Sequence, residues 1–165
     1  MNIVFQPLHS DHRIPVMEIF NHYTADSFAA FPSKPLPEPF FDRIVEKIHG
    51  YPAYAILDGK TVAGFCFLSP YSPLDTFQET ALITYFIAEA YTGRGLGTLA
   101  LERLLADARI RGIRHILAEV ASKNAASIVF HRKHGFELCG TLHGIGRKHG
   151  ENFDVVLMQK ELQPA

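Results

Sequence analysis

The feature that most constrains the fold is an apolar run that leads through a glycine-rich turn into an amphipathic helix. Residues 81–88 read ALITYFIA, a β-branched and aromatic run that predicts a buried strand and is too short to span a membrane. Glycines then recur at every second position, at Gly93, Gly95 and Gly97. Residues 96–110 place apolar side chains at helical spacing, with charged residues on the other face. This stretch therefore predicts a central strand, a tight turn and a helix in direct succession.

Glycines at the start of a helix suggest a use for the turn. Because glycine lacks a Cβ atom, the backbone can adopt positive φ values and approach a bulky ligand closely. The free N–H groups of the first helical turn and the positive end of the helix dipole attract anions. We therefore expect residues 93–98 to bind a phosphate, and most simply a pyrophosphate. A tight turn without a ligand is the alternative, since short glycine patterns are common.

Two other phosphate-binding motifs match this turn poorly. A Walker loop requires a lysine after its last glycine, and none follows Gly97. A dinucleotide fingerprint requires Gly-x-Gly-x-x-Gly, and here Gly95 and Gly97 are followed by Ala100, which that motif tolerates. The fingerprint also needs a preceding parallel βαβ strand, whereas the chain before residue 81 is patterned as hairpin strands. A nucleotide-binding module is thus the weaker alternative.

The rest of the chain predicts a single α/β domain over residues 1–165, because 47% apolar content suffices for one core. An Asp58-Gly59-Lys60 turn predicts a hairpin, and the strand after the glycine-led helix predicts a βαβ unit with parallel strands. Expected strands are residues 2–6, 53–57, 61–68, 81–88, 115–121, 136–140 and 154–160. Expected helices are residues 10–24, with Ser10 or Asp11 as N-cap, and 40–49, 96–110 and 124–134; residues 26–39 form a proline-rich loop.

Composition narrows the function classes. Lys and Arg number 16 against 17 Asp and Glu, so a nucleic-acid footprint is not expected, and no polybasic or lipidation signal indicates a membrane. The first residues lack the apolar core of a signal peptide. Cys66 and Cys139 lie among apolar neighbours, which favours buried reduced thiols in a cytoplasmic protein. No metal site is expected, because His131 and His134 form an i, i+3 pair typical of a helix surface.

Two segments resemble the signatures of the Gcn5-related N-acetyltransferase (GNAT) family. Residues 85–87 and 93–98, YFI and GRGLGT, are similar to its acetyl-CoA signature, Gln/Arg-x-x-Gly-x-Gly/Ala, with Thr92 in place of the usual Gln or Arg. Residues 124–136, NAASIVFHRKHGF, are similar to its second signature, Asn-x-x-Ala/Ser-x-x-Leu-Tyr/His-x-x-x-Gly-Phe, with Phe130 in place of Leu. The resemblance implies an α/β GNAT fold with a mixed, mostly antiparallel sheet that is splayed at the cofactor site and flanked by helices.

The C-terminal residues 141–162 resemble those of phosphinothricin-type acetyltransferases in particular. Those members show Gly-x-Lys-x-Gly-x-Trp-x-Asp, and here Phe153 or Asn152 takes the place of Trp, which leaves the acceptor open. A homodimer is a family-level expectation. In this family the region equivalent to the proline-rich loop helps to wall the acceptor pocket, so Phe28 and Phe31 could contact substrate; alternatively, they cap the core.

The resemblance implies acetyl-CoA as cofactor. The backbone of the central strand would pair with the pantetheine arm, the Ile87 amide would be the oxyanion donor, and a β-bulge would free these groups. Asn124 and Ser127 would contact the cofactor, or serve only as helix N-cap and first turn. The residues implied to bind acetyl-CoA are Tyr85, Phe86, Ile87, Gly93, Arg94, Gly95, Leu96, Gly97, Thr98, Asn124, Ser127 and His131.

Three residues are candidates for the proton transfers. His131 stands where the family usually has the Tyr that meets the sulfur of coenzyme A, so it could be the acid or could only pack on the cofactor. Glu119 resembles the base of ribosomal-protein N-terminal acetyltransferases, and a carboxylate in an apolar strand needs a partner or a cleft. Phosphinothricin-type enzymes use an acid in the central strand, where this chain has Leu82; Glu79 is the nearby substitute.

The resemblance thus implies an N-acetyltransferase that moves an acetyl group from acetyl-CoA to the primary amine of a small molecule by direct transfer in a ternary complex. The acceptor would be an amino acid, an analogue or a polyamine. A protein N-terminal acetyltransferase, suggested by Glu119, is one alternative. A catalytically silent acyl-CoA-binding sensor domain, suggested by Leu82, is another.

Overall fold

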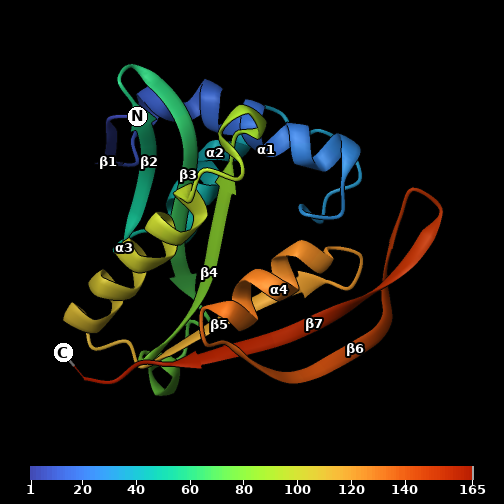
Figure 1. The fold of residues 1–165 in the computed structure, drawn as a ribbon. Coiled ribbons are helices and arrows are strands. Elements are labelled where there is room, and N and C mark those ends of the chain that lie inside the picture. Colours follow the sequence, from blue (N-terminus) through green and yellow to red (C-terminus); the bar gives the residue numbers. More distant parts are fainter. Residues whose placement is uncertain (165) are drawn as a thin grey trace.

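The described residues, 1–164 of a computed structural model, form a seven-stranded sheet with helices over both faces (Figure 1). The strands are β1 Ile3–Pro7, β2 Ala53–Asp58, β3 Thr61–Pro70, β4 Thr80–Ile87, β5 His115–Ala121, β6 Glu137–Lys148 and β7 Glu151–Glu161. The helices are α1 Arg13–Asp26, α2 Phe40–Lys47, α3 Leu96–Ile110 and α4 Ala125–Lys133, with short 3-10 turns at Ser10–His12, Asp75–Phe77 and Glu89–Tyr91. The predicted mixed α/β fold is confirmed.

The sheet has the strand order β1-β2-β3-β4-β5-β7-β6, and only the central pair β4 and β5 is parallel. These two strands pair over a short stretch, from Thr80 opposite His115 to Leu82 opposite Leu117. Beyond it they diverge, so that the sheet opens in its middle (Figure 1). The predicted splay therefore lies between the first and second strands of the βαβ unit.

The two faces of β4 serve different layers, because successive residues of a strand point to opposite sides. Tyr85 and Ile87 pack against the cluster that includes α3, whose buried face contains Leu101 and Leu104. Phe86 packs on the other side, in the cluster of α1 and α2. Side chains from both layers therefore reach the opening between β4 and β5.

The C-terminal hairpin is longer than the sequence predicted. Strands of 12 and 11 residues, β6 and β7, replace the expected 136–140 and 154–160, and they turn at His149 and Gly150, both with positive φ. Glycines in the intervening segment lower its β-propensity, which hid the extension. Packing explains the glycine at position 146, since a Cβ there would lie 2.1 Å from the Phe153 ring. The expectation that both cysteines are buried was wrong for Cys139, which is exposed on the edge strand β6, whereas Cys66 is buried.

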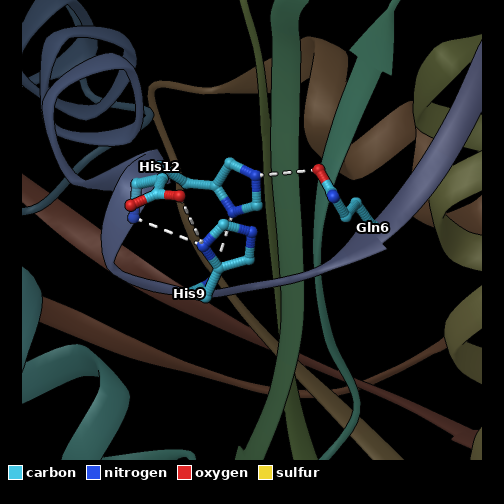
Figure 2. A network of polar contacts seen from close by, with 4 residues as sticks. Gln6, His9 and His12 are labelled. Carbon is cyan, nitrogen blue, oxygen red and sulfur yellow. Dashed lines mark hydrogen bonds and ion pairs between the residues drawn. The ribbon is translucent and has the colours of Figure 1, made fainter.

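The helix predicted to begin at a Ser10 or Asp11 cap begins instead with the 3-10 turn Ser10–His12, which carries the side-chain cap, and α1 follows from Arg13 without one. The cap is His9, whose Nδ1 accepts a hydrogen bond from the Asp11 amide at 3.3 Å (Figure 2). His12 returns the contact, because its Nδ1 accepts from the His9 amide at 3.2 Å. Its Nε2 lies 3.1 Å from Oε1 of Gln6 on β1, so the tautomer with hydrogen on Nε2 satisfies both partners. Two histidines thus form the capping box that Ser and Glu usually provide.

Candidate active site

A cavity of about 760 Å³ occupies the opening between β4 and β5. Its walls come from both layers of the fold: β4, β5 and α4 on one side, and α1, α2 and residues 29–32 on the other. Most of the walls are aromatic or aliphatic, with a few polar groups. A large apolar cavity with convergent polar groups is the usual form of a ligand site.

Backbone groups of β4 face this cavity without a strand partner. The Ala88 amide donates to the Ala63 carbonyl at 2.8 Å, so even-numbered residues of this strand turn their backbone groups toward β3. Tyr85 and Ile87 therefore turn theirs toward β5, which has already diverged. The predicted bulge in β4 is not the cause, because the β3–β4 register runs without a shift from Gly64↔Ile87 to Pro70↔Ala81. The strand splay itself frees the groups.

The glycine turn presents a second set of free donors. Gly93 and Gly95 have φ of 72° and 83°, and a Cβ at either would meet nothing within 4 Å, so these glycines are required by conformation rather than by space. α3 begins at Leu96 and its first backbone bond runs from Leu99 to Gly95. Within residues 1–164, the amides of residues 96–98 have no acceptor and no side-chain cap. They are the amides that the sequence predicts to bind an anion, and they are free to do so.

The side chains of this turn have other contacts. Leu96 is buried in the core, and the Thr98 hydroxyl lies 3.2 Å from Nε2 of His134. The Arg94 guanidinium stacks 5.5 Å from the Tyr91 ring centre. Gly97 lines the cavity next to the ring of Phe130. The turn therefore offers a ligand mainly backbone, which explains why Thr92 in place of Gln or Arg leaves the donor set intact.

The start of α4 lies on the same cavity. Asn124 Oδ1 accepts from the Ser127 amide at 3.3 Å, so Asn124 is the N-cap of this helix. Both residues also line the cavity. The cap and cofactor-contact interpretations are therefore compatible in space.

His131 forms a buried pair with Tyr85. The His131 ring is 3% exposed, and its Nδ1 lies 2.7 Å from the Ser127 carbonyl, which can only accept. Nδ1 therefore carries the hydrogen, and Nε2 accepts from the Tyr85 hydroxyl. Burial lowers the pKa of His131, and nearby His134 lowers it further, while burial raises the pKa of Tyr85. Both side chains of the pair are thus neutral. The Tyr85 hydroxyl, which the sequence analysis did not identify as a donor, donates the hydrogen bond between them.

Glu119 is an exposed residue on β5 that lines the cavity, and it is the only carboxylate among the lining residues. A carboxylate in an apolar strand needs a partner or a cleft, and for Glu119 the cavity is that cleft. Glu79 does not line the cavity. It is exposed just before β4, and its carbonyl accepts from the amides of Arg114 and His115 at the closed end of the sheet. The structure brings Glu119, but not Glu79, to the cavity.

The proline-rich loop contributes one of its two predicted aromatic residues. Phe31 lines the cavity and stacks on Phe153 with ring centres 6.0 Å apart. Phe28 lies outside the lining and packs edge to face on Phe153 at 5.6 Å, as a cap on that cluster. Buried Lys148, which is 2% exposed, donates to the Ala30 carbonyl at 2.7 Å and ties this loop to the β6–β7 hairpin.

Several lining residues were missed by sequence reasoning. Tyr23 on α1 lines the cavity and donates to the Ile87 carbonyl. One face of α2 also lines it, and the signal for this face was the helical spacing of residues 40–48. Among the residues that the structure describes, no group of three or more His, Cys, Asp or Glu side chains is placed to hold a metal ion.

Comparison with known proteins agrees with this geometry. The model of the acetyltransferase (GNAT) family matches residues 16–136. The chain belongs to the GNAT family. L-methionine sulfoximine/L-methionine sulfone acetyltransferase of Pseudomonas aeruginosa is 29% identical to this GNAT protein over 90% of the chain and 88% of the relative. Phosphinothricin N-acetyltransferase of Streptomyces viridochromogenes is 26% identical over 90% of the chain and 81% of the relative.

A solved structure extends the likeness to the cofactor. The acetyltransferase yncA of Salmonella typhimurium, solved with its cofactor acetyl-CoA, superposes with a TM-score of 0.89 at 25% identity, covering 99% of this chain and 95% of that one. The predicted family, its phosphinothricin-type relatives, the N-acetyltransferase class and acetyl-CoA as cofactor are thereby confirmed. No helix within residues 1–164 has the length and apolarity to cross a membrane.

Proposed function

We propose that this N-acetyltransferase transfers an acetyl group from acetyl-CoA to the primary amine of a small amino acid or amino-acid analogue. One observation carries the proposal: the free amides at the start of α3 lie beside a parted pair of strands whose inner amides have no strand partner. The relatives that act on methionine sulfoximine, methionine sulfone and phosphinothricin support the acceptor class.

The chain fits the cofactor in two places. The amides of residues 96–98 suit a diphosphate, because they are unpaired and lie at the positive end of α3. The backbone groups of Tyr85 and Ile87 suit the amides of the pantetheine arm, and the Ile87 N–H suits the thioester oxygen. When bound, acetyl-CoA supplies an activated acetyl thioester and a thiolate leaving group. Asn124 and Ser127 complete the proposed binding set from α4.

We assign the proton transfers to Glu119 and to the Tyr85–His131 pair. Glu119 takes the proton of the acceptor ammonium, directly or through water, so that a neutral amine attacks. The C–N bond would then form as the C–S bond breaks, the sulfur would keep the electron pair, and the nitrogen would release its second proton to solvent. By rotating its single hydrogen away from His131 Nε2, the Tyr85 hydroxyl would donate a hydrogen bond to that sulfur, which would then be protonated from solvent. Before transfer, neutral His131 holds this hydroxyl at the cavity by accepting its hydrogen, so His131 would position Tyr85 in place of the predicted acid role.

A homodimer and a cytoplasmic location belong to the same proposal. The edge strand β6 exposes Leu138, Leu142 and Ile145, which supports pairing with a second copy through this strand. Light scattering after size exclusion tests the dimer, and Ile145→Lys should reduce its mass to that of a monomer. A monomeric wild-type protein would refute this part alone.

Turnover tests the function. Free thiol is measured after the protein is mixed with acetyl-CoA and, in turn, an amino-acid panel, a polyamine panel and peptides with free N-termini. The proposal predicts thiol release and an acetylated product with amino acids. Acetylation of peptides alone would favour the N-terminal acetyltransferase, and acetyl-CoA binding without turnover on any amine would favour the sensor domain.

A further inference from the structure

One face of α2, continued by Ile48, lines the cavity on the side of the proline-rich loop. Residues Phe40, Arg43, Ile44, Lys47 and Ile48 all contribute to the lining. Their spacing of i, i+3, i+4, i+7 and i+8 places them on a single face of a helix. The aliphatic members of this face are buried, and the two cations are exposed at its edge. α2 therefore presents two positive charges to the cavity mouth.

The acidic residues of α2 are placed elsewhere. Asp42 and Glu46 do not line the cavity, and Asp42 Oδ1 binds the Arg13 guanidinium of α1 at 2.7 Å. Arg43 and Lys47, in contrast, form no ion pair within 4.0 Å among residues 1–164. Side chains four residues apart on a helix are neighbours, with Cβ atoms about 6 Å apart. The two cations thus form an uncompensated positive pair.

The opposite charge in the cavity comes from another element. Glu119, on β5, is the only carboxylate that lines it, and the intervening walls are largely apolar, with rings of Phe31, Phe67 and Phe86. Charges act over longer distances across such walls than in bulk water. The cavity is therefore polarised, with a carboxylate on the β5 side and two cations on the α2 side.

We propose that Arg43 and Lys47 form the subsite for an anionic group of the acetyl acceptor, a carboxylate in the case of an amino acid. The inference rests on the proposed function, in which the acceptor amine approaches Glu119. A guanidinium can bind a carboxylate through two hydrogen bonds, and the ammonium of Lys47 adds a second charge. A polyamine would place a further ammonium in this positive field. Of the acceptor classes that the sequence left open, the amino acid and its analogues match the cavity.

The test compares two acceptors that differ only in the anionic group: L-methionine sulfone and its α-carboxamide. Arg43→Gln and Lys47→Gln are measured with each acceptor, and Lys60→Gln is the matched control, since Lys60 is exposed in the β2–β3 turn and does not line the cavity. For the acid, kcat/KM should fall about tenfold or more in each cavity variant, mainly through KM. For the carboxamide, kcat/KM of each cavity variant should equal that of the wild-type protein. The control should match the wild-type protein with both acceptors.

Equilibrium binding separates this inference from the proposed function. Isothermal titration calorimetry of L-methionine sulfone into protein saturated with coenzyme A does not depend on turnover. Binding that weakens in Arg43→Gln and Lys47→Gln supports the subsite, even if the wild-type protein transfers no acetyl group and the proposed function fails. Equal losses for acid and carboxamide, no loss in either variant, or no binding of the acid by the wild-type protein would each overturn the subsite.

Discussion

Gly95 and Gly97 lie two residues apart in the glycine turn, yet the structure predicts opposite effects when each is replaced by alanine. Gly95 has φ of 83°, a conformation that costs a residue with a side chain about 1–2 kcal/mol. Alanine also lowers the conformational entropy of the unfolded chain, which offsets about 0.4–1 kcal/mol of this cost. Gly95→Ala should therefore lower the free energy of unfolding by about 1 kcal/mol. Gly97 is helical, and a Cβ there would make an ordinary 3.6 Å contact with Phe130, so Gly97→Ala should raise it by about 0.5–1 kcal/mol.

Urea unfolding measures these differences, and each kcal/mol should move the thermal midpoint by about 2–4 °C in a chain of this size. Calorimetry with acetyl-CoA completes the assay: Gly95→Ala should weaken binding, because it turns the amides that follow. Gly59→Ala is the matched control, since Gly59 also has positive φ but lies in the β2–β3 turn outside the cavity. It should lose stability and keep its affinity. Stability changes of the same sign for Gly95→Ala and Gly97→Ala, or normal affinity in Gly95→Ala, would refute the reasoning.

Three further predictions follow from the cavity and the N-terminal cap. Tyr85→Phe removes the hydroxyl held by His131 and should lower kcat about 10²-fold at unchanged acetyl-CoA affinity. The control Tyr54→Phe removes a hydroxyl that binds Asp107 outside the cavity and should leave kcat unchanged. Equal kcat values for the two variants would exclude a role of the Tyr85 hydroxyl in acetyl transfer. Glu119→Gln should lower kcat about 10²-fold at unchanged acetyl-CoA affinity, and an unchanged kcat would rule out this base. Burial lowers the pKa of His12 below 6.5, so its neutral form stabilises the fold above that pH and this contribution is lost as pH falls through 6.5. Urea unfolding of His12→Gln should show a smaller loss between pH 7.5 and 5 than the wild-type protein, and an equal loss would contradict the capping geometry.

The parts of the site that sequence predicted are those governed by local chemistry. Positive φ at Gly93 and Gly95, and free amides after them, follow from residue type and order alone. The parallel pairing of residues 81–88 with 115–121 follows from the handedness of a βαβ unit. Family signatures then fixed the fold around these elements.

The rest depends on contacts between distant segments. His131 is neutral because burial lowers its pKa, and Tyr85, on another element, donates its hydroxyl to Nε2. The expected bulge was replaced by strand divergence, which no residue of β4 encodes by itself. The sequence did not identify Arg43 and Lys47 as site residues, because only the folded structure determines which face of α2 lines the cavity.

The central claim is that the free amides at the start of α3 bind the diphosphate of acetyl-CoA, and amide NMR tests it most directly. A ¹⁵N-labelled sample is titrated with acetyl-CoA and, in parallel, with acetyl-pantetheine, which lacks the diphosphate. The amide signals of Leu96, Gly97 and Thr98 should show the largest shifts with acetyl-CoA and small shifts with acetyl-pantetheine. Unchanged signals for these three amides in protein saturated with acetyl-CoA would contradict the account.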